Sequence, residues 1–364
     1  MPARPRKGCR TTRMSATPFS AALLRASLDG FAGLAASRLL EVDPSSATLD
    51  GLSGWKTFQR EQLAGLVAAL DTGSPAGFAA RSAWSRDAFA ARGTPRDVLL
   101  SALDALSDVL EDALPGEAWS VLIPYFAAAR QELRSAARAL TSALDPADVR
   151  GRVVLRYVDA LRACDEPLAL AVVLDEVASG RVHAREALME LLVPAQREIG
   201  RLWHRGEIGV AQEHFASNVT RRVVERVLAI APRAAPRGKP VVVAAVAGDA
   251  HDLGVLVVAG CFELAGWRTL FLGSNVPAVD LTQIAVQCDA GIVALGATID
   301  TQREAAAAAI VALRAARPGQ KVIVGGPAFS CCDDAWKRIG ADAMARDARE
   351  AVEIGERLRG ASSG

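Results

Sequence analysis

The sequence has few of the side chains from which protein metal sites and disulfide frameworks are usually built. Only four histidines occur among 364 residues, and no H-E-x-x-H pattern is present. The six cysteines show neither C-x-x-C spacing nor the density of a disulfide framework, which predicts a reducing, cytoplasmic location. They are Cys9, Cys164, Cys261, Cys288, Cys331 and Cys332.

An excess of charge of one sign and long apolar runs are missing as well. Lys and Arg number 42 and Asp and Glu number 41, a net charge of +1 that gives no reason to expect a nucleic acid or a membrane as partner. No run of about 18 charge-free apolar residues predicts a transmembrane span. Residues 1–16 are basic, but no apolar segment or cleavage site follows them, so we expect a flexible tail rather than a signal peptide.

What the sequence does contain is a long helical pattern followed by a strand–helix alternation. Residues 17–145 carry apolar side chains at steps of three and four residues, which predicts an all-helical sensor domain, either a helical bundle or a globin-like fold. We expect five helices there, the first over Phe19–Val42 and the last from Glu117 to Leu144. The next region, 147–232, predicts four helices, near 148–163, 166–179, 184–203 and 209–230.

Residues 239–360 have the pattern of a doubly wound, Rossmann-like α/β domain with a parallel sheet. Fully apolar, β-branched runs alternate with helical segments, which is typical of strands buried on both faces. The expected strands are 241–246, 268–272, 291–295, 321–324 and, more weakly, 341–344. Ligands of such sheets bind beyond the carboxyl ends of the strands. The loops expected to line one site are therefore 247–254, 273–277, 296–300 and 325–330.

The first of these loops contains Asp249-x-His251-x-x-Gly254. A carboxylate two residues before a histidine can hold one ring nitrogen and make the other more basic toward a metal. No second His, Cys or tight carboxylate cluster lies nearby to complete a zinc site. A lone imidazole suits a metal that brings its own equatorial ligands, so the loop predicts a macrocycle, either a corrinoid or a haem.

This motif resembles the signature of B12-binding domains, which continues with Ser-x-Leu and then Gly-Gly at fixed spacings. Gly296-Ala297-Thr298 stands where the family has Ser-x-Leu, and Gly325-Gly326 stands where the family has its glycine pair. The resemblance implies that His251 ligates cobalt from below. It also implies that the dimethylbenzimidazole tail threads into the sheet, past glycines that permit close backbone approach. Thr298 or Ser274 is the candidate hydroxyl donor to that tail.

A second motif, Trp203 followed after nine residues by Glu213-His214, lies in the four-helix region. It resembles the cap of CarH-type photoreceptors, which hold adenosylcobalamin in the dark. The resemblance implies that Trp203 covers the adenosyl group, that Glu213 and His214 contact it, and that light releases it. His204 is then the candidate cobalt ligand after illumination, and we expect a homo-oligomer whose assembly depends on light. Trp203 in a core and Glu213-His214 on a solvated face are the structural alternatives.

The first region lacks the strands of a winged helix and a concentrated basic recognition helix. A helical domain joined to a cobalamin photoreceptor resembles the photocobilins, which implies a second chromophore, biliverdin. Arg81, Trp84 and Arg86 are candidates for the mouth of such a site, the alternative being a solvated arginine face with a core tryptophan. Region 17–145 contains no cysteine, so attachment of the bilin is expected to be noncovalent.

Two rival functions remain open for the same domain. One is a corrinoid carrier protein for methyl transfer, which would need a methyltransferase partner. The other is a haem-binding regulator with His251 as axial ligand. Since no Ser/His/Asp arrangement or P-loop occurs, the leading prediction is a non-enzymatic light sensor with an unidentified downstream protein partner.

Overall fold

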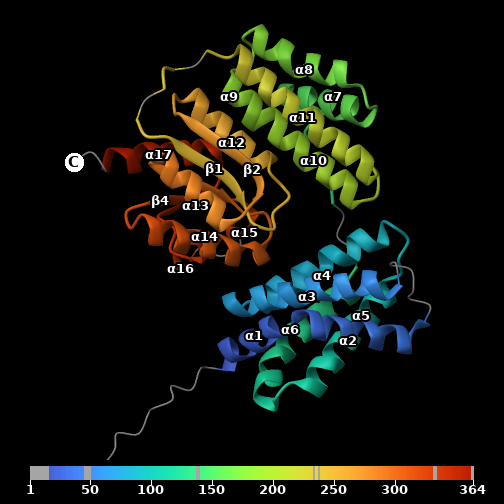
Figure 1. Cartoon of the computed structure of the whole chain (residues 1–364). Helices are drawn as coiled ribbons and strands as arrows, with labels where there is room; N and C mark the ends of the chain where they lie inside the picture. Colours follow the sequence, from blue (N-terminus) through green and yellow to red (C-terminus); the bar gives the residue numbers. More distant parts are fainter. Residues whose placement is uncertain are drawn as a thin grey trace, which may run out of the picture. The chain divides into compact units, whose positions relative to one another are not determined.

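The chain divides into two compact units, Met1–Ala137 and Arg138–Gly364 (Figure 1). The computed structural model describes residues 16–44, 51–136, 140–232, 234–236, 238–330 and 334–361. The expected basic tail, apart from residue 16, and the cysteines Cys9, Cys331 and Cys332 lie outside these residues. Within them, no helix combines the length and the apolar character needed to cross a membrane.

The described part of the first unit is helical, as predicted. Its helices are α1 (Ala16–Ala26), α2 (Leu28–Val42), α3 (Gly51–Thr72), α4 (Pro75–Ala90), α5 (Arg96–Ala113) and α6 (Gly116–Arg134). Its core is formed around large side chains that are fully buried, among them Trp55, Phe78 and Phe126. The more specific expectation of a globin-like fold stays a prediction.

Two helix boundaries in this unit differ from the predictions. The helix expected over Phe19–Val42 is interrupted at Ser27, where a second helix begins, and the Ser27 carbonyl accepts the first hydrogen bond of α2 from the Phe31 N–H. The Ser27 side chain makes no capping hydrogen bond, and the interruption lies in its backbone, which has a non-helical φ of −137° and ψ of 26°. The helix expected to reach Leu144 ends at Arg134.

The early end of α6 has a specific cause in α4. The Arg86 side chain is only 3% exposed, and its guanidinium donates to the carbonyl oxygens of Glu132 and Ser135 and to the Ser135 hydroxyl. These bonds add to those that the Glu132 carbonyl accepts from the N–H and hydroxyl of Ser135, and together they fix the C-terminus of α6. Trp84, by contrast, is 52% exposed. The expectation of a solvated Arg86 beside a core Trp84 is therefore wrong.

The four helical segments of the second unit lie where the sequence pattern predicts them. They are α7 (Val149–Arg162), α8 (Glu166–Ala178), the continuous run α9 (Ala184–Glu186), η2 (Ala187–Leu192) and α10 (Val193–His204), and α11 (Val210–Ile230). The widened π turn η2 ends two residues before Pro194, which has no N–H to donate back along the helix. We call α7–α11 the four-helix segment.

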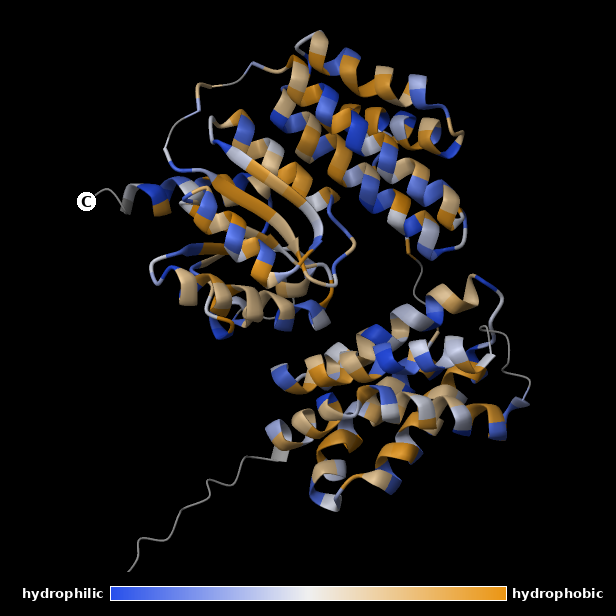
Figure 2. Cartoon of the chain, in the orientation of Figure 1, coloured by the Kyte–Doolittle hydropathy of each residue, from blue (hydrophilic) through white to orange (hydrophobic). Residues whose placement is uncertain are grey.

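The parallel sheet of the second unit is confirmed, with strand order β2-β1-β3-β4-β5. The strands are β1 (Val241–Val246), β2 (Thr269–Val276), β3 (Ile292–Gly296), β4 (Lys321–Gly325) and β5 (Ala343–Ala345). Strand β2 runs four residues beyond its expected end, so most of the expected loop 273–277 belongs to a strand. Figure 2 shows β1 as an almost uninterrupted apolar strand, and all six of its residues are buried.

Helices cover both faces of this sheet. Residues Val241, Val243 and Ala245 of β1 belong to the core shared with α12 (Leu253–Leu264) and α17 (Ala348–Ala361). The alternate residues of β1 belong to the core shared with the opposite helix layer. That layer contains α13 (Ala278–Gln287) and α14 (Arg303–Ala316), with the short elements η3 (Asp300–Gln302), α15 (Pro327–Ser330) and α16 (Ala335–Arg338) nearby in the chain.

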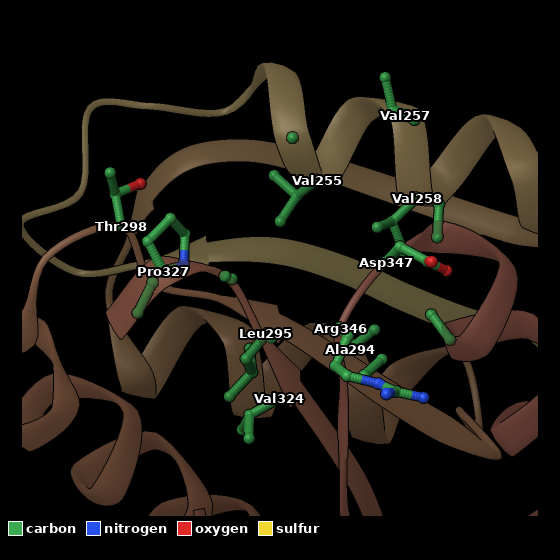
Figure 3. A pocket seen from close by; sticks show the side chains of 18 of the residues that line it. Val255, Val257, Val258, Ala294, Leu295, Thr298, Val324, Pro327, Arg346 and Asp347 are labelled. Carbon is green, nitrogen blue, oxygen red and sulfur yellow. The ribbon is translucent and has the colours of Figure 1, made fainter. Parts of the chain in front are cut away.

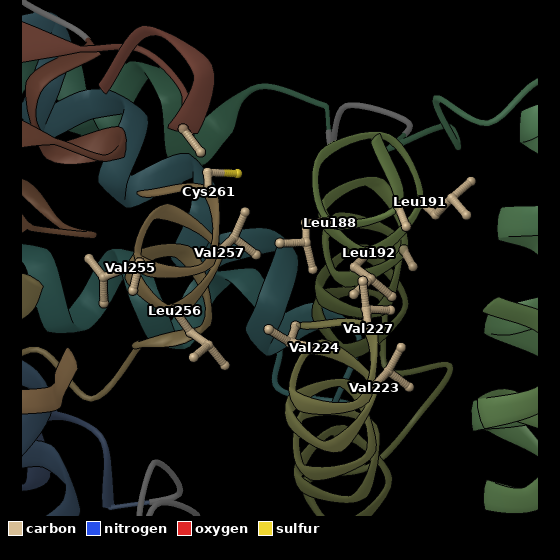
Figure 4. Close-up of a cluster of buried hydrophobic side chains, with 14 of the residues drawn as sticks. Leu188, Leu191, Leu192, Val223, Val224, Val227, Val255, Leu256, Val257 and Cys261 are labelled. Carbon is tan, nitrogen blue, oxygen red and sulfur yellow. The ribbon is translucent and has the colours of Figure 1, made fainter. Parts of the chain in front are cut away.

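The four-helix segment packs on α12 through apolar side chains. Figure 4 shows Leu188 from η2 and Val224 from α11 directed toward Leu256 and its neighbours on α12. Gly260 makes this approach possible, because a Cβ at that position would lie 3.0 Å from Leu188 Cδ1 and 3.2 Å from Leu228 Cδ1. The segment and the sheet therefore share one hydrophobic core.

Candidate functional site

The site is built around the loop that follows β1, at the carboxyl edge of the sheet. Asp249 is buried, with 1% of its side chain exposed, whereas 72% of the His251 side chain is exposed. Asp249 Oδ1 accepts from the His251 backbone N–H at 3.0 Å and lies 3.1 Å from His251 Nδ1. Asp249 Oδ2 accepts from the Thr298 N–H at 2.8 Å. The carboxylate thus holds the imidazole by one nitrogen and leaves Nε2 available.

The electrostatics of this pair follow from its contacts. Burial opposes ionisation of Asp249, but its hydrogen bonds from His251 and Thr298 outweigh burial and lower the pKa of the carboxyl. The hydrogen bond to Asp249 raises the pKa of His251 against the effect of its own desolvation. The negative charges of Asp249, Glu213 and Asp252 raise it further. Asp249 therefore makes the imidazole a better base.

Two side chains from neighbouring strand ends fix the backbone of this loop. Gln302 is 6% exposed; its Oε1 accepts from the N–H groups of Thr298 and Ile299, and its Nε2 donates to the Gly248 carbonyl at 3.2 Å. Asn275 Oδ1 accepts from the Gly248 N–H at 2.7 Å. Gly248 itself has a φ of +79°, a conformation that favours glycine. The loop is therefore pre-formed.

A cavity of about 520 Å³ opens beside this loop and runs between the sheet and helices α12 and α17 (Figure 3). Val243 of β1 pairs with Ala294 of β3, which in turn pairs with Ile323 of β4. All three residues line the cavity, so it extends far along the sheet. At its rim lie Asp249, His251 and Thr298. The lining from the strands and from α12 is mostly apolar, so the cavity suits a flat apolar group inserted past a polar rim.

Four glycines of the predicted motifs line the cavity, for different reasons: Gly254, Gly296, Gly325 and Gly326. A Cβ at Gly296 would lie 2.3 Å from Val255 Cγ1, so α12 packs too closely there for a side chain. A Cβ at Gly254 would have no heavy atom of the protein within 4 Å, so that position faces open space. At Gly325 and Gly326, neighbouring backbone atoms of the protein leave no room for a side chain. A Cβ would lie 2.9 Å from the Ala345 oxygen at Gly325 and 2.4 Å from the Ala297 oxygen at Gly326, where φ is +100°.

The other predicted residues do not line this cavity. Trp203 is half-buried and packs against the shared core, and His204 is 6% exposed. Glu213 acts electrostatically on His251, whereas His214, one residue further along α11, has 69% of its side chain exposed. Ser274 is exposed on β2 outside the cavity lining, and Thr298 is the hydroxyl-bearing candidate that lies at the rim.

Sequence reasoning missed several residues that shape the site. Met189 and Val193 of the four-helix segment line the cavity, and Gln302 and Arg221 act on the loop from outside it. Gln302 had a detectable signal, since glutamine at the third position of a helical turn is typical of side chains that bond back to its start. The roles of Met189, Val193 and Arg221 depend on how η2, α10 and α11 pack, which no local sequence pattern shows.

Among the described residues, no group of three or more His, Cys, Asp or Glu side chains is arranged to hold a metal ion. His251 is thus a lone donor beside an apolar cavity. Comparison with known proteins agrees with this chemistry: the sequence model of the B12 binding domain matches residues 239–354, and a second B12 binding domain model matches residues 153–228. Residues 239–354 are a B12-binding domain.

The relatives of this chain include two kinds of protein. The dimethylamine corrinoid protein of Methanosarcina barkeri is 29% identical over 205 residues, which are 55% of this chain and 94% of that protein. The HTH-type transcriptional repressor CarH of Myxococcus xanthus is 32% identical over 170 residues, 46% of this chain and 56% of CarH. The monomethylamine corrinoid protein structure from Methanosarcina barkeri aligns with a TM-score of 0.49 at 20% identity, covering 58% of this chain and all of that one.

Proposed function

We propose that the B12-binding domain holds cobalamin with His251 Nε2 as the lower axial ligand of cobalt. The observation that carries this proposal is the exposed imidazole, held at Nδ1 by the buried Asp249 carboxylate at 3.1 Å beside a cavity of about 520 Å³. Because a corrin supplies four equatorial nitrogens, one protein donor is enough. The residues present therefore fit the cofactor.

The cavity fits the nucleotide tail of the same cofactor. Its apolar depth between the sheet and α12 suits a benzimidazole ring, and Thr298 at the rim offers a hydroxyl. A side chain at position 254 would enter the open space beside Gly254 and compete with the tail for it. Haem, the rival macrocycle, has no such tail, so a cavity that extends this far into the sheet favours a corrinoid.

We propose further that the bound form is adenosylcobalamin and that the protein is a light sensor rather than an enzyme. When bound, this cofactor supplies a cobalt–carbon bond that visible light breaks. Glu213 of α11 is among the negative charges that raise the pKa of His251, and this supports a role of the four-helix segment at the site. Trp203 and His214 complete the proposed adenosyl pocket.

His204 remains the candidate ligand of the upper face after illumination. Since its side chain is only 6% exposed, the end of α10 must move before the imidazole reaches any ligand. Such a movement would also alter the surface of the four-helix segment. It provides a physical route from light to the expected change in the assembly of a homo-oligomer.

A second candidate function is a corrinoid carrier for methyl transfer. It is favoured by the similarity to the dimethylamine corrinoid protein, of which the match covers 94%. Absorption spectra of the reconstituted full chain, in the dark and after illumination, separate the candidates. The light sensor requires photolysis of the adenosyl form together with a changed size-exclusion profile; a carrier would accept methyl groups and show no light-dependent profile.

The same spectra test the two histidines. His251→Ala is expected to give a base-off spectrum or to lose the cofactor, and an unchanged spectrum and affinity would contradict the assignment. His204→Ala is expected to change only the illuminated spectrum. If it matches the wild type after illumination, His204 is not the new ligand.

Biliverdin in the first unit also stays a prediction. The interior cavity described there holds about 10 Å³, beside Gln59 and Gln62, and a surface groove of about 250 Å³ lies beside Leu34. Ligand sites usually measure several hundred cubic ångströms. Each of these two cavities is smaller than that. The cytoplasmic location and the downstream protein partner likewise stay predictions, the former resting on the cysteine pattern.

A further inference from the structure

A polar contact joins the four-helix segment to the loop that carries His251. Helix α11 presents Glu213, Ser217 and Arg221 at intervals of four residues, so these side chains share one face of the helix. The Ser217 hydroxyl donates to Glu213 Oε1 at 2.7 Å, and the Arg221 guanidinium donates to Asp252 Oδ1 at 2.6 Å. Asp252 directly follows His251 in the chain and immediately precedes α12.

The Asp252 carboxylate depends on this contact. Its side chain is 12% exposed, and that of Arg221 is 34% exposed. Among the residues that the structure describes, Arg221 is the one hydrogen-bonding or ion-pairing partner of the Asp252 carboxylate. A carboxylate so far removed from water is strongly disfavoured without a charged partner. Loss of Arg221 should therefore displace the loop toward solvent.

The apolar contact between the four-helix segment and α12 does not reach the loop in this specific way. Leu188, Val224 and Leu256 pack through apolar contacts that carry no hydrogen bond or charge (Figure 4). A charge-assisted hydrogen bond fixes distance and direction. The ion pair Arg349–Glu190, at 3.6 Å, also joins the two parts, but it reaches α17 and not the loop.

We propose that Arg221 is a positioning residue that couples the position of α11 to the loop 249–252 and so to His251. A displacement of α11, which also carries Glu213, is transmitted through Asp252 to His251, the residue directly before it in the chain. This inference rests on the proposed function only for the identity of the ligand. The ion pair belongs to the ligand-free chain, so the coupling can be measured without cobalamin.

The chain offers a matched control on the same helix. Arg222 follows Arg221 and pairs with Glu166 at 2.7 Å, within the four-helix segment. Arg221→Gln and Arg222→Gln therefore remove the same charge from adjacent positions. Arg221→Gln breaks a contact between the four-helix segment and the loop 249–252. Arg222→Gln breaks a contact within the four-helix segment.

Hydrogen exchange of the full, ligand-free chain is the first measurement. In a peptide covering residues 249–256, exchange should rise about tenfold in Arg221→Gln and stay at the wild-type rate in Arg222→Gln. Arg221→Lys keeps the charge and should stay within about threefold of the wild type. Equal rates in the two Gln variants would overturn the proposal. So would a Lys variant as fast as Arg221→Gln, or an equal rise in peptides from β3 and β4, which would indicate general unfolding.

Dissociation of hydroxocobalamin from the loaded full chain is the second measurement. It should be about tenfold faster in Arg221→Gln than in Arg222→Gln, because loss of one member of a largely buried charge pair acts mainly on the off-rate. Equal off-rates would show that the loop is not held by Arg221 and would overturn the coupling to the site. If the wild type takes up no cobalamin, the proposed function fails, while the exchange comparison still decides the coupling.

Discussion

At the scale of single residues, the site depends on an ion pair whose members differ in exposure. Asp249 is fixed by backbone hydrogen bonds in a buried position, so it orients His251 without enclosing the ring. Such an arrangement keeps one imidazole nitrogen open to a large ligand. It also makes Asp249 the main influence on the acid–base behaviour of His251, so the role of Asp249 can be measured.

The pKa of His251 in the ligand-free chain tests this arrangement. The hydrogen bond and the charge of Asp249 raise it above the ordinary value of about 6.5. Asp249→Asn should therefore lower the His251 pKa, as followed by NMR titration of the ring proton. Asp280→Asn serves as a control, because Asp280 is not among the main charges that raise the His251 pKa. A His251 pKa that is the same with Asp and with Asn at position 249 would contradict the pairing.

The same shifts set the pH range in which the pair stabilises the fold. The Asp249 pKa is lowered in the folded chain, so its contribution is lost as the pH falls through that lowered value. The His251 pKa is raised, so its contribution is lost as the pH rises through the raised value. The pair thus stabilises the folded chain most between about pH 4 and 6.5. Its contribution to the free energy of unfolding is less than about 1 kcal/mol, because solvent screens the exposed imidazole.

At the scale of elements, the close approach of the four-helix segment to α12 depends on one glycine. A Cβ at Gly260 would lie 3.0 Å from Leu188 and 3.2 Å from Leu228, tighter than ordinary packing contacts. Gly260→Ala should lower the free energy of unfolding by about 1–3 kcal/mol through overpacking, as measured by urea denaturation.

The control for this substitution lies on α10. A Cβ at Gly200 would meet no heavy atom within 4 Å. Gly200→Ala should therefore leave stability unchanged or raise it by up to about 1 kcal/mol, because alanine is the better helix former. If both variants have the same stability, the contact at Gly260 is not tight in solution.

Sequence patterns predict most elements of this protein because its buried apolar residues recur at the spacings typical of helices and strands. The apolar strand β1 and the alternating loops and helices that follow it predict the parallel sheet, and Asp249 and His251 fall in the loop that their spacing indicates. The end of α6 was missed because it depends on Arg86, a residue 46 positions away from the carbonyl of Glu132 that it binds. Arg221 was missed for the same reason, since its partner Asp252 lies 31 positions away.

At the scale of the whole molecule, the chain joins two units with separate cores. The second unit, Arg138–Gly364, contains both segments that match B12 binding domains. The 205 residues matched in the dimethylamine corrinoid protein are 94% of that relative, which is little longer than the matched part. We therefore expect the second unit, which has its own core, to fold without the first.

Expression of residues 138–364 alone tests this view. The fragment should unfold cooperatively and bind hydroxocobalamin with the affinity of the full chain, because the core that joins the four-helix segment to the sheet lies entirely within it. Absorbance titration and thermal denaturation of both proteins provide the comparison. Biliverdin produced in the same cells should be retained by the full chain and not by the fragment, since the predicted bilin site lies in residues 17–145. A fragment that folds but binds cobalamin more than about tenfold less tightly would show that the first unit contributes to the cobalamin site.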